Sequence, residues 1–294
     1  MKKAIALFLI IVGSGTFFIF YVSGEQNVLE EKFTYVSEDE SADFVHYDTS
    51  LKLINKVDKD EYTIKWRLAS KLDRSAYWRQ DLSLLYEDGR LIEKLSKSGE
   101  NTRRLEQSKK INREDNGHFQ AISVHHAEIH YPNGKVTTQQ KMSYDQLYVT
   151  ASPLGPMEAF EIPRTEEEKE WQKIMNHATK QQLHYAWKDL LKQYHIRSKR
   201  FYHFSLPYLH VYNRNKLPGM TEQQTEKAIG KLWEKLYKHY FHGIKTEGGE
   251  VVNPIGSTVP LVLLNKDGSR FVVLTKTAAG ESVKLVQPLD EINH

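Results

Sequence analysis

A short run of histidines with one glutamate is the clearest candidate for chemistry in this chain. It reads HHAEIH at positions 125–130. Because side chains alternate between the two faces of a strand, His126, Glu128 and His130 would share one face. Imidazole and carboxylate groups are zinc ligands, and neighbours two residues apart lie roughly 7 Å apart, so a pair of them could chelate one ion.

A complete zinc site needs more than these three residues, because together they span about 13 Å along a strand. A further ligand would have to come from a neighbouring strand, and the candidates are His46, His118 and Glu114. The alternative is a solvated sheet face on which His and Glu pair across strands. We favour this alternative, and zinc remains a candidate cofactor.

The second candidate is a basic stretch between positions 171 and 246. It holds fourteen Lys and Arg residues against four Asp and Glu residues, so it should attract anionic partners. Its densest cluster is HIRSKR at 195–200, and the predicted anion-binding residues are His195, Arg197, Lys199 and Arg200. Phospholipid head groups, wall polyanions such as teichoic acids, or an acidic protein would suit this charge. The alternative explanation is that basic residues late in a helix complement its dipole.

Motifs that mark the common enzyme classes do not occur in the sequence. There is no Gly-x-Ser-x-Gly elbow, no phosphate-binding loop, no dinucleotide fingerprint and no cysteine. The formal net charge is only +3, which predicts no nucleic-acid partner. The sequence therefore favours a protein that is not an enzyme.

Two capped helices are expected to carry the basic stretch. Thr165 with Glu168, and Thr221 with Gln224, have the spacing of capping boxes, which satisfy the first free amides of a helix. Apolar residues at helical spacing follow each box, and Gly243 is placed to end the second helix.

Strands are expected elsewhere. Alternation of apolar and charged residues over 61–68 predicts a half-buried strand, and 87–90 (EDGR) predicts a hairpin turn. A three-stranded meander is expected over 259–286. The segment 97–117 is polar throughout, and we expect it to form an exposed loop or a loose helix.

The N-terminus predicts where the protein is located. Lys2 and Lys3 precede the uncharged run 4–22, whose length suits the crossing of a lipid bilayer. The positive flank holds the short N-terminus in the cytoplasm and places the rest outside it. The alternative is a cleaved signal peptide, after which the protein would be secreted.

Together these patterns predict an α+β fold: a single N-terminal transmembrane helix followed by a mixed ectodomain of antiparallel β-hairpins and two amphipathic helices. The expected domains are a membrane anchor (1–24), an acidic juxtamembrane spacer (25–50), a β-rich domain (51–155) and an α+β domain (156–294).

The predicted function is that of a membrane-anchored, extracytoplasmic protein of the bacterial cell envelope. It would bind, scaffold or regulate an anionic envelope polymer or a membrane protein partner, and contact the lipid bilayer through residues 4–22. The alternative is an extracytoplasmic metal-dependent hydrolase that acts on an envelope polymer or lipid through His126, Glu128 and His130.

Overall fold

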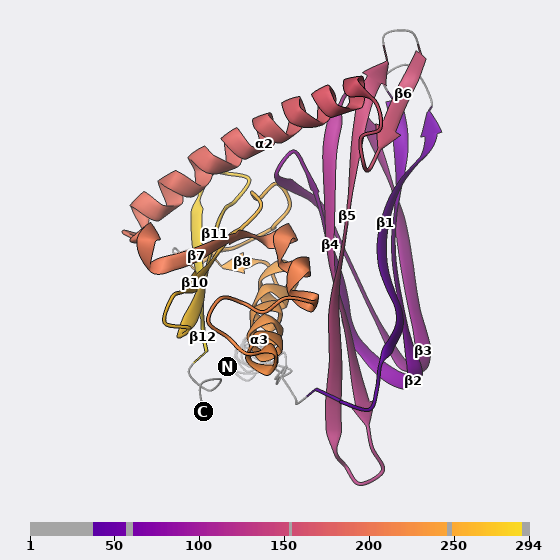
Figure 1. The fold of residues 1–294 in the computed structure, drawn as a ribbon, viewed down its shortest axis with the longest axis vertical. Helices are drawn as coiled ribbons and strands as arrows, with labels where there is room; N and C mark the ends of the chain where they lie inside the picture. Colours follow the sequence, from indigo (N-terminus) through magenta and orange to yellow (C-terminus); the bar gives the residue numbers. More distant parts are fainter. Residues whose placement is uncertain (1–37, 57–60, 153–154, 246–248, 290–294) are drawn as a thin grey trace, which may run out of the picture. The chain divides into compact units, whose positions relative to one another are not determined.

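The computed structural model describes residues 38–56, 61–152, 155–245 and 249–289 (Figure 1). The chain divides into the units Met1–Thr34 and Tyr35–His294, and all the described residues belong to the second. Within this part of the chain, six strands form a first sheet, four form a second sheet and two pair with each other.

The first sheet is antiparallel and built from long strands. They are β1 (Phe44–Lys56), β2 (Glu61–Glu87), β3 (Arg90–Glu114), β4 (Gly117–His130), β5 (Val136–Ser152) and β6 (Gly155–Phe160). The order is β1-β2-β4-β5-β6, and β3 pairs with β2. The sheet curls until β1 meets β5, where the backbone amide of Leu51 donates to the Asp145 carboxylate at 2.7 Å.

The predicted hairpin turn joins β2 to β3. Asp88 and Gly89 both have left-handed backbones, with φ of 47° and 83°, as the tightest hairpin turns require. The prediction from the EDGR pattern is therefore confirmed.

The second sheet is also antiparallel, and it contains the predicted C-terminal meander. Its strands are β7 (Phe201–Ser205), β10 (Leu261–Asn265), β11 (Arg270–Lys276) and β12 (Ser282–Pro288), in the order β12-β11-β10-β7. The remaining pair is β8 (Ile244–Lys245) with β9 (Val251–Val252).

Two α-helices cover opposite faces of the second sheet (Figure 1). They are α2 (Glu166–Gln193) and α3 (Glu222–Phe241), and both predicted capping boxes are present. The C-terminal half of α2 packs through Leu190 on Leu261 and Leu263. The opposite face of the sheet joins α3 in the largest apolar cluster, which also takes side chains from the first sheet.

The expected α+β class is wrong, because the described part is mainly β. The helices α2 and α3 hold 28 and 20 residues, whereas β2 and β3 alone hold 27 and 25. Most of the error falls on 97–117, whose polar composition predicts an exposed loop or a loose helix but which is largely the strand β3. This strand is polar because most of its side chains face solvent, and in that segment Leu105 and Ile111 are the large apolar side chains buried in the core.

The transmembrane part of that prediction has no counterpart in the described fold. None of the helices in the described ranges is both long and apolar enough to span a membrane. The run 4–22 and the domain 1–24 lie outside the described residues, as does most of the spacer 25–50. Strand β1 begins at Phe44, inside that predicted spacer.

A polar belt divides the interior of the curled first sheet. Along β4, Phe119 and Ala121 belong to one apolar cluster, and Ala127 and Ile129 belong to another. Between them the belt is a chain of hydrogen-bonded side chains, in the order Asp81, Ser70, His125, Ser143, Thr49, Ser123 and Ser83. Its centre is His125, whose ring nitrogens each lie 2.7 Å from a serine hydroxyl.

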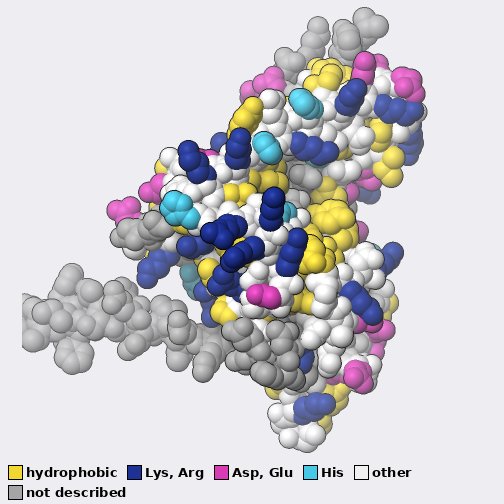
Figure 2. All heavy atoms as spheres, turned by 60° about the vertical axis from the view of Figure 1, so that its left-hand side comes forward, with side chains coloured by type: hydrophobic (Ala, Val, Ile, Leu, Met, Phe, Trp, Pro, Cys, Tyr) yellow, Lys and Arg dark blue, Asp and Glu magenta, His cyan; other side chains and the backbone are white. Residues whose placement is uncertain are grey.

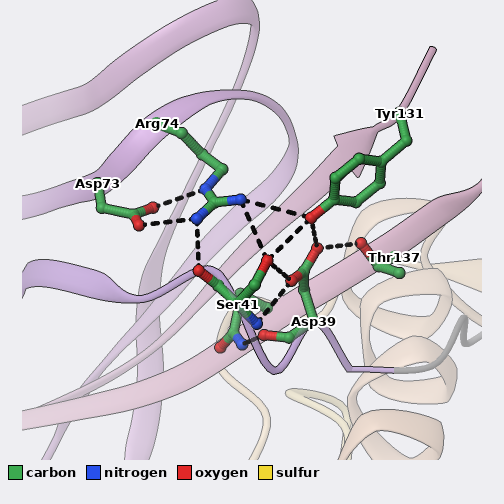
Figure 3. Close-up of polar contacts among 7 residues, drawn as sticks. Asp39, Ser41, Asp73, Arg74, Tyr131 and Thr137 are labelled. Atoms are coloured by element: carbon green, nitrogen blue, oxygen red, sulfur yellow. Dashed lines mark hydrogen bonds and ion pairs between the residues drawn. The ribbon is translucent and has the colours of Figure 1, made fainter.

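A second polar cluster fastens the first described residues to the sheet (Figure 3). Asp39 is 4% exposed, and its carboxylate accepts hydrogen bonds from Tyr131 and Thr137 at 2.7 and 2.5 Å. It also accepts two from Ser41, whose carbonyl in turn accepts one from Arg74. We call this cluster the Asp39 latch.

Candidate functional site: a cationic groove beyond helix α2

The C-terminus of α2 turns the basic cluster back onto the second sheet. The backbone amide of Ile196 donates to the Leu191 carbonyl at 2.9 Å, and that of His195 to the Lys192 carbonyl at 3.1 Å, which is the Schellman arrangement. His195 takes the left-handed position of this motif, with φ of 52°, where Gly is the usual residue. A short 3-10 helix, η1 (Ser198–Arg200), then leads directly into β7.

A groove of about 710 Å³ lies just beyond this helix end. All four predicted anion-binding residues line it, and the structure adds three cations from the second sheet. The basic lining residues are His195, Arg197, Lys199, Arg200, Lys266, Arg270 and Lys284. The two groups meet because the Lys266 amide donates to the Arg200 carbonyl at 3.0 Å, which ties the β10–β11 hairpin to η1.

The groove has a strong positive charge. Its lining has six Lys and Arg side chains, all exposed, and the single carboxylate of Asp267. Hydrogen bonds from the side chain and backbone of Ser269 lower the pKa of Asp267 and fix it in the hairpin turn. None of the six cations has an ion-pair partner among the described residues. Figure 2 shows Lys and Arg side chains gathered over part of this side of the protein.

The floor of the groove is apolar. Val272 and Val286 are cross-strand partners in β11 and β12, and they lie on the face that α2 covers further along. Because α2 ends before this point, Val286 stays 39% exposed. The Lys284 ammonium lies 4.7 Å from the centre of the Tyr194 ring, so the wall combines charge with an aromatic face. A ligand with an anionic group and an apolar part matches these surroundings.

Lys266, Arg270 and Lys284 were missed from the sequence because they lie about seventy residues after the basic cluster. A local signal did exist, since the turn after β10 and the alternation in β11 place Arg270 and Val272 on one face. What the sequence lacks is the strand order that brings this face to the end of α2.

The predicted zinc residues are arranged as part of a sheet face. Within the described ranges, no group of three or more His, Cys, Asp or Glu side chains could hold a metal ion. The His130 ring lies 3.2 Å from the Glu128 carboxylate and stacks on Tyr77 at 4.2 Å. Burial lowers the pKa of His126 to about 4. His118 is eight residues away along β4, about 26 Å, so it cannot complete a site with His126.

The polar belt inside the first sheet also contains groups that enzymes use in catalysis, since His125 lies between two serine hydroxyls. However, the side chains of His125 and Asp81 are 0% and 1% exposed, so a substrate has no access to them. This cluster is part of the core.

The left-handed backbone of His195, at the edge of the groove, leads to a prediction about stability. Replacing His195 with Gly should raise the free energy of unfolding by roughly 0.5–1 kcal/mol, because a left-handed backbone costs a residue with a Cβ about 1 kcal/mol or more. Thermal unfolding would measure this as a rise of about 1–4 °C. Gln193→Gly, in the last helical turn, is the control and should lower the midpoint. A fall for His195→Gly would mean that the imidazole makes stabilising contacts that outweigh the strain.

No family model, no curated protein and no solved structure matches this chain. The basis for assigning a function is therefore the chemistry of the groove.

Proposed function

We propose that this protein binds a phosphate-bearing lipid of the cell envelope in the cationic groove, without catalysing a reaction on it. The observation that carries the proposal is that seven basic side chains line the groove together with the apolar Val272 and Val286. An anionic phospholipid supplies a phosphate for the basic side chains and glycerol or acyl carbons for the two valines. A soluble polyanion would satisfy the cations but leave the floor in water.

The location outside the cytoplasm is part of the same proposal. It rests on Lys2, Lys3 and the uncharged run 4–22, which would bring the chain to the membrane. Anionic head groups are concentrated there, and each Lys or Arg near such a surface is worth about 1 kcal/mol.

Neutralising the groove tests the proposal. The triple variant Arg197→Gln/Lys199→Gln/Arg200→Gln should weaken binding by about 3 kcal/mol, a factor of roughly 100. The ligand would be water-soluble, short-chain phosphatidylglycerol, titrated into the purified full chain at two salt concentrations. Binding should also weaken as salt rises, because these cations are exposed.

The matched control removes the same charge elsewhere. Lys65, Arg103 and Lys110 are exposed on β2 and β3, outside the groove, and their triple Gln variant should bind like the original chain. An equal loss of lipid binding in both triple variants would show that the lipid is attracted by the charge of the protein in general and not bound in the groove. Equal binding of short-chain phosphatidylcholine would show that the anionic head group is not recognised. Binding of soluble poly(glycerol phosphate) but not of the lipid would assign the groove to a polymer.

A further inference from the structure

We propose that a cleft along α2 is a second binding site, which takes a single-chain anionic amphiphile of the long-chain fatty acid type. The cleft has a volume of about 540 Å³ and is lined by α2, β4 of the first sheet and β7 of the second. It shares no lining residue with the cationic groove. The proposal therefore stands independently of the function proposed for that groove.

One part of the cleft is apolar. Leu183, Trp187 and Leu191 recur at a spacing of four along α2 and form one wall. Phe204, Val259 and Leu261 also line the cleft, and the Trp187 indole donates to the Val259 carbonyl at 3.0 Å. From Leu183 to Leu191 the helix rises about 12 Å. One leaflet of a bilayer is about 15 Å of hydrocarbon thick, so the wall covers most of the length of one acyl chain.

The other end of the cleft is polar. Asn176, Thr179 and Lys180 lie within about one turn of α2, and they line the cleft together with His118 and Gln120 of β4. His118 and Thr179 are 3% and 6% exposed. Within the described residues, the hydroxyl of Thr179 has no partner in hydrogen-bond geometry, whereas the His118 ring has the Gln146 side chain as a partner. Buried polar groups normally have such partners, so the Thr179 hydroxyl, next to the exposed Lys180, marks this end of the cleft for a polar group of a ligand.

These polar residues are held in position by one tyrosine. The His118 ring stacks on Tyr148 at 4.2 Å with an angle of 4° between the rings. The Tyr148 hydroxyl donates to the Asn176 side chain at 3.0 Å. Burial lowers the pKa of His118 to about 4, partly opposed by the nearby Gln146 amide, so the imidazole is neutral at pH 7 and keeps one N–H donor.

The charges select an anion. The cleft is lined by Lys180 and Lys188 and by no Asp or Glu. A carboxylate at the polar end would accept a hydrogen bond from the exposed Lys180 ammonium, which follows Thr179 on α2. Its alkyl chain would then run along the wall of Leu183, Trp187 and Leu191. The polar atoms and the apolar wall thus fix the direction of the ligand.

The test compares palmitate with hexadecanol, which has the same chain and no charge. Palmitate should bind the purified full chain and raise its melting temperature, and hexadecanol should bind at least tenfold more weakly. Lys180→Gln should weaken palmitate binding at least tenfold without changing the melting temperature of the free protein, because Lys180 is exposed. Lys173→Gln, an exposed lysine of α2 outside the cleft, is the control and should bind palmitate normally.

A second variant separates binding from folding. His118→Phe keeps the stack on Tyr148 and makes the polar end of the cleft apolar, so it should weaken palmitate binding at least tenfold while the protein still folds. The proposal fails if palmitate does not bind, if hexadecanol binds equally well, or if Lys180→Gln binds normally. It also fails if neutralising Arg197, Lys199 and Arg200 abolishes palmitate binding while Lys180→Gln does not, because the fatty acid would then occupy the groove.

Discussion

Asp81→Asn is expected to stabilise the protein by about 3–4 kcal/mol at pH 8 and to have little effect at pH 4. The Asp81 side chain is 1% exposed, and its burial raises the pKa from 3.8 to about 7, although hydrogen bonds from Ser70 and His126 oppose the shift. Each unit of difference between folded and unfolded pKa corresponds to about 1.4 kcal/mol. The buried carboxylate therefore destabilises the fold once it is ionised.

The geometry of the belt allows Asn to replace the neutral acid. Protonated Asp81 can donate to the Ser70 hydroxyl, which then donates to Nδ1 of His125, and Nε2 of His125 donates to Ser143. An Asn amide can supply the same first donor. The backbone amide of His126 still finds an oxygen acceptor at residue 81. Asp81→Asn thus keeps the chain of hydrogen bonds from residue 81 to Ser143 and removes the buried negative charge.

His125 titrates in the opposite sense to Asp81, so the pH dependence of stability can separate the two residues. Burial lowers its pKa to about 3, so folding removes a proton from His125 below pH 6.5 and gives one to Asp81 above about pH 4. Between those values the two effects cancel, and this pair adds no slope to stability against pH. In Asp81→Asn only His125 remains, and stability should fall as pH drops from 6.5. In His125→Phe only Asp81 remains, and stability should fall as pH rises from 4 to 7.

Urea unfolding of the three proteins at half-unit pH steps would measure these slopes. In each single variant, the slope of unfolding free energy against pH should differ from that of the original chain by about 1.4 kcal/mol per pH unit, which corresponds to about one proton. The two differences should have opposite signs. Parallel curves would contradict the interpretation. They would mean that Asp81 and His125 stay an ion pair in the folded protein, so that neither carries a shift of its own.

Part of the fold could be predicted because its signals are local. A capping box needs four consecutive residues and a hairpin turn needs two, so Thr165, Thr221 and the Asp88-Gly89 turn were identified correctly. Most of strand β3 is not predicted, because most of its side chains face solvent. In addition, its partner residues in β2 are more than twenty positions away in the sequence for much of its length. A polar strand of this kind is recognisable only once its pairing with β2 is known.

The same limit applies to the sites. Arg197, Lys199 and Arg200 are conspicuous as a cluster in the sequence, whereas Arg270 joins them only through the register of β10, β11 and β12. Likewise, the HHAEIH run drew attention to His126 and away from His125, which is the residue at the centre of the buried belt. Alternation along a strand divides a run into two faces but does not say which face is the core.

Asp39→Ala is expected to cost about 3 kcal/mol of unfolding free energy at pH 7. The carboxylate accepts four hydrogen bonds, from the amide and hydroxyl of Ser41 and the hydroxyls of Tyr131 and Thr137. Hydrogen bonds to a charged group contribute about 1.5–3 kcal/mol each when one is removed, and some of these donors can turn to water. Asp43→Ala is the control, because Asp43 is exposed, and it should change stability by less than about 0.5 kcal/mol.

Acid should remove the contribution of the Asp39 latch to stability only below about pH 4. Burial opposes ionisation of Asp39, but the hydrogen bonds from Thr137, Tyr131 and Ser41 outweigh it and hold the pKa well below its usual range. The latch therefore contributes its full stability above about pH 4 and loses it as the pH falls further. Asp39→Ala should remove this part of the acid sensitivity, so that its unfolding free energy declines less steeply below pH 4.

A double-mutant cycle decides whether the latch acts as one unit. Tyr131→Phe and Thr137→Val each remove one donor to the same Asp39 oxygen (Figure 3). If Asp39 organises the cluster, either change should cost about 1 kcal/mol in the original chain and almost nothing in Asp39→Ala. Equal costs in both backgrounds would contradict the latch, because Tyr131 and Thr137 would then stabilise the sheet through contacts of their own.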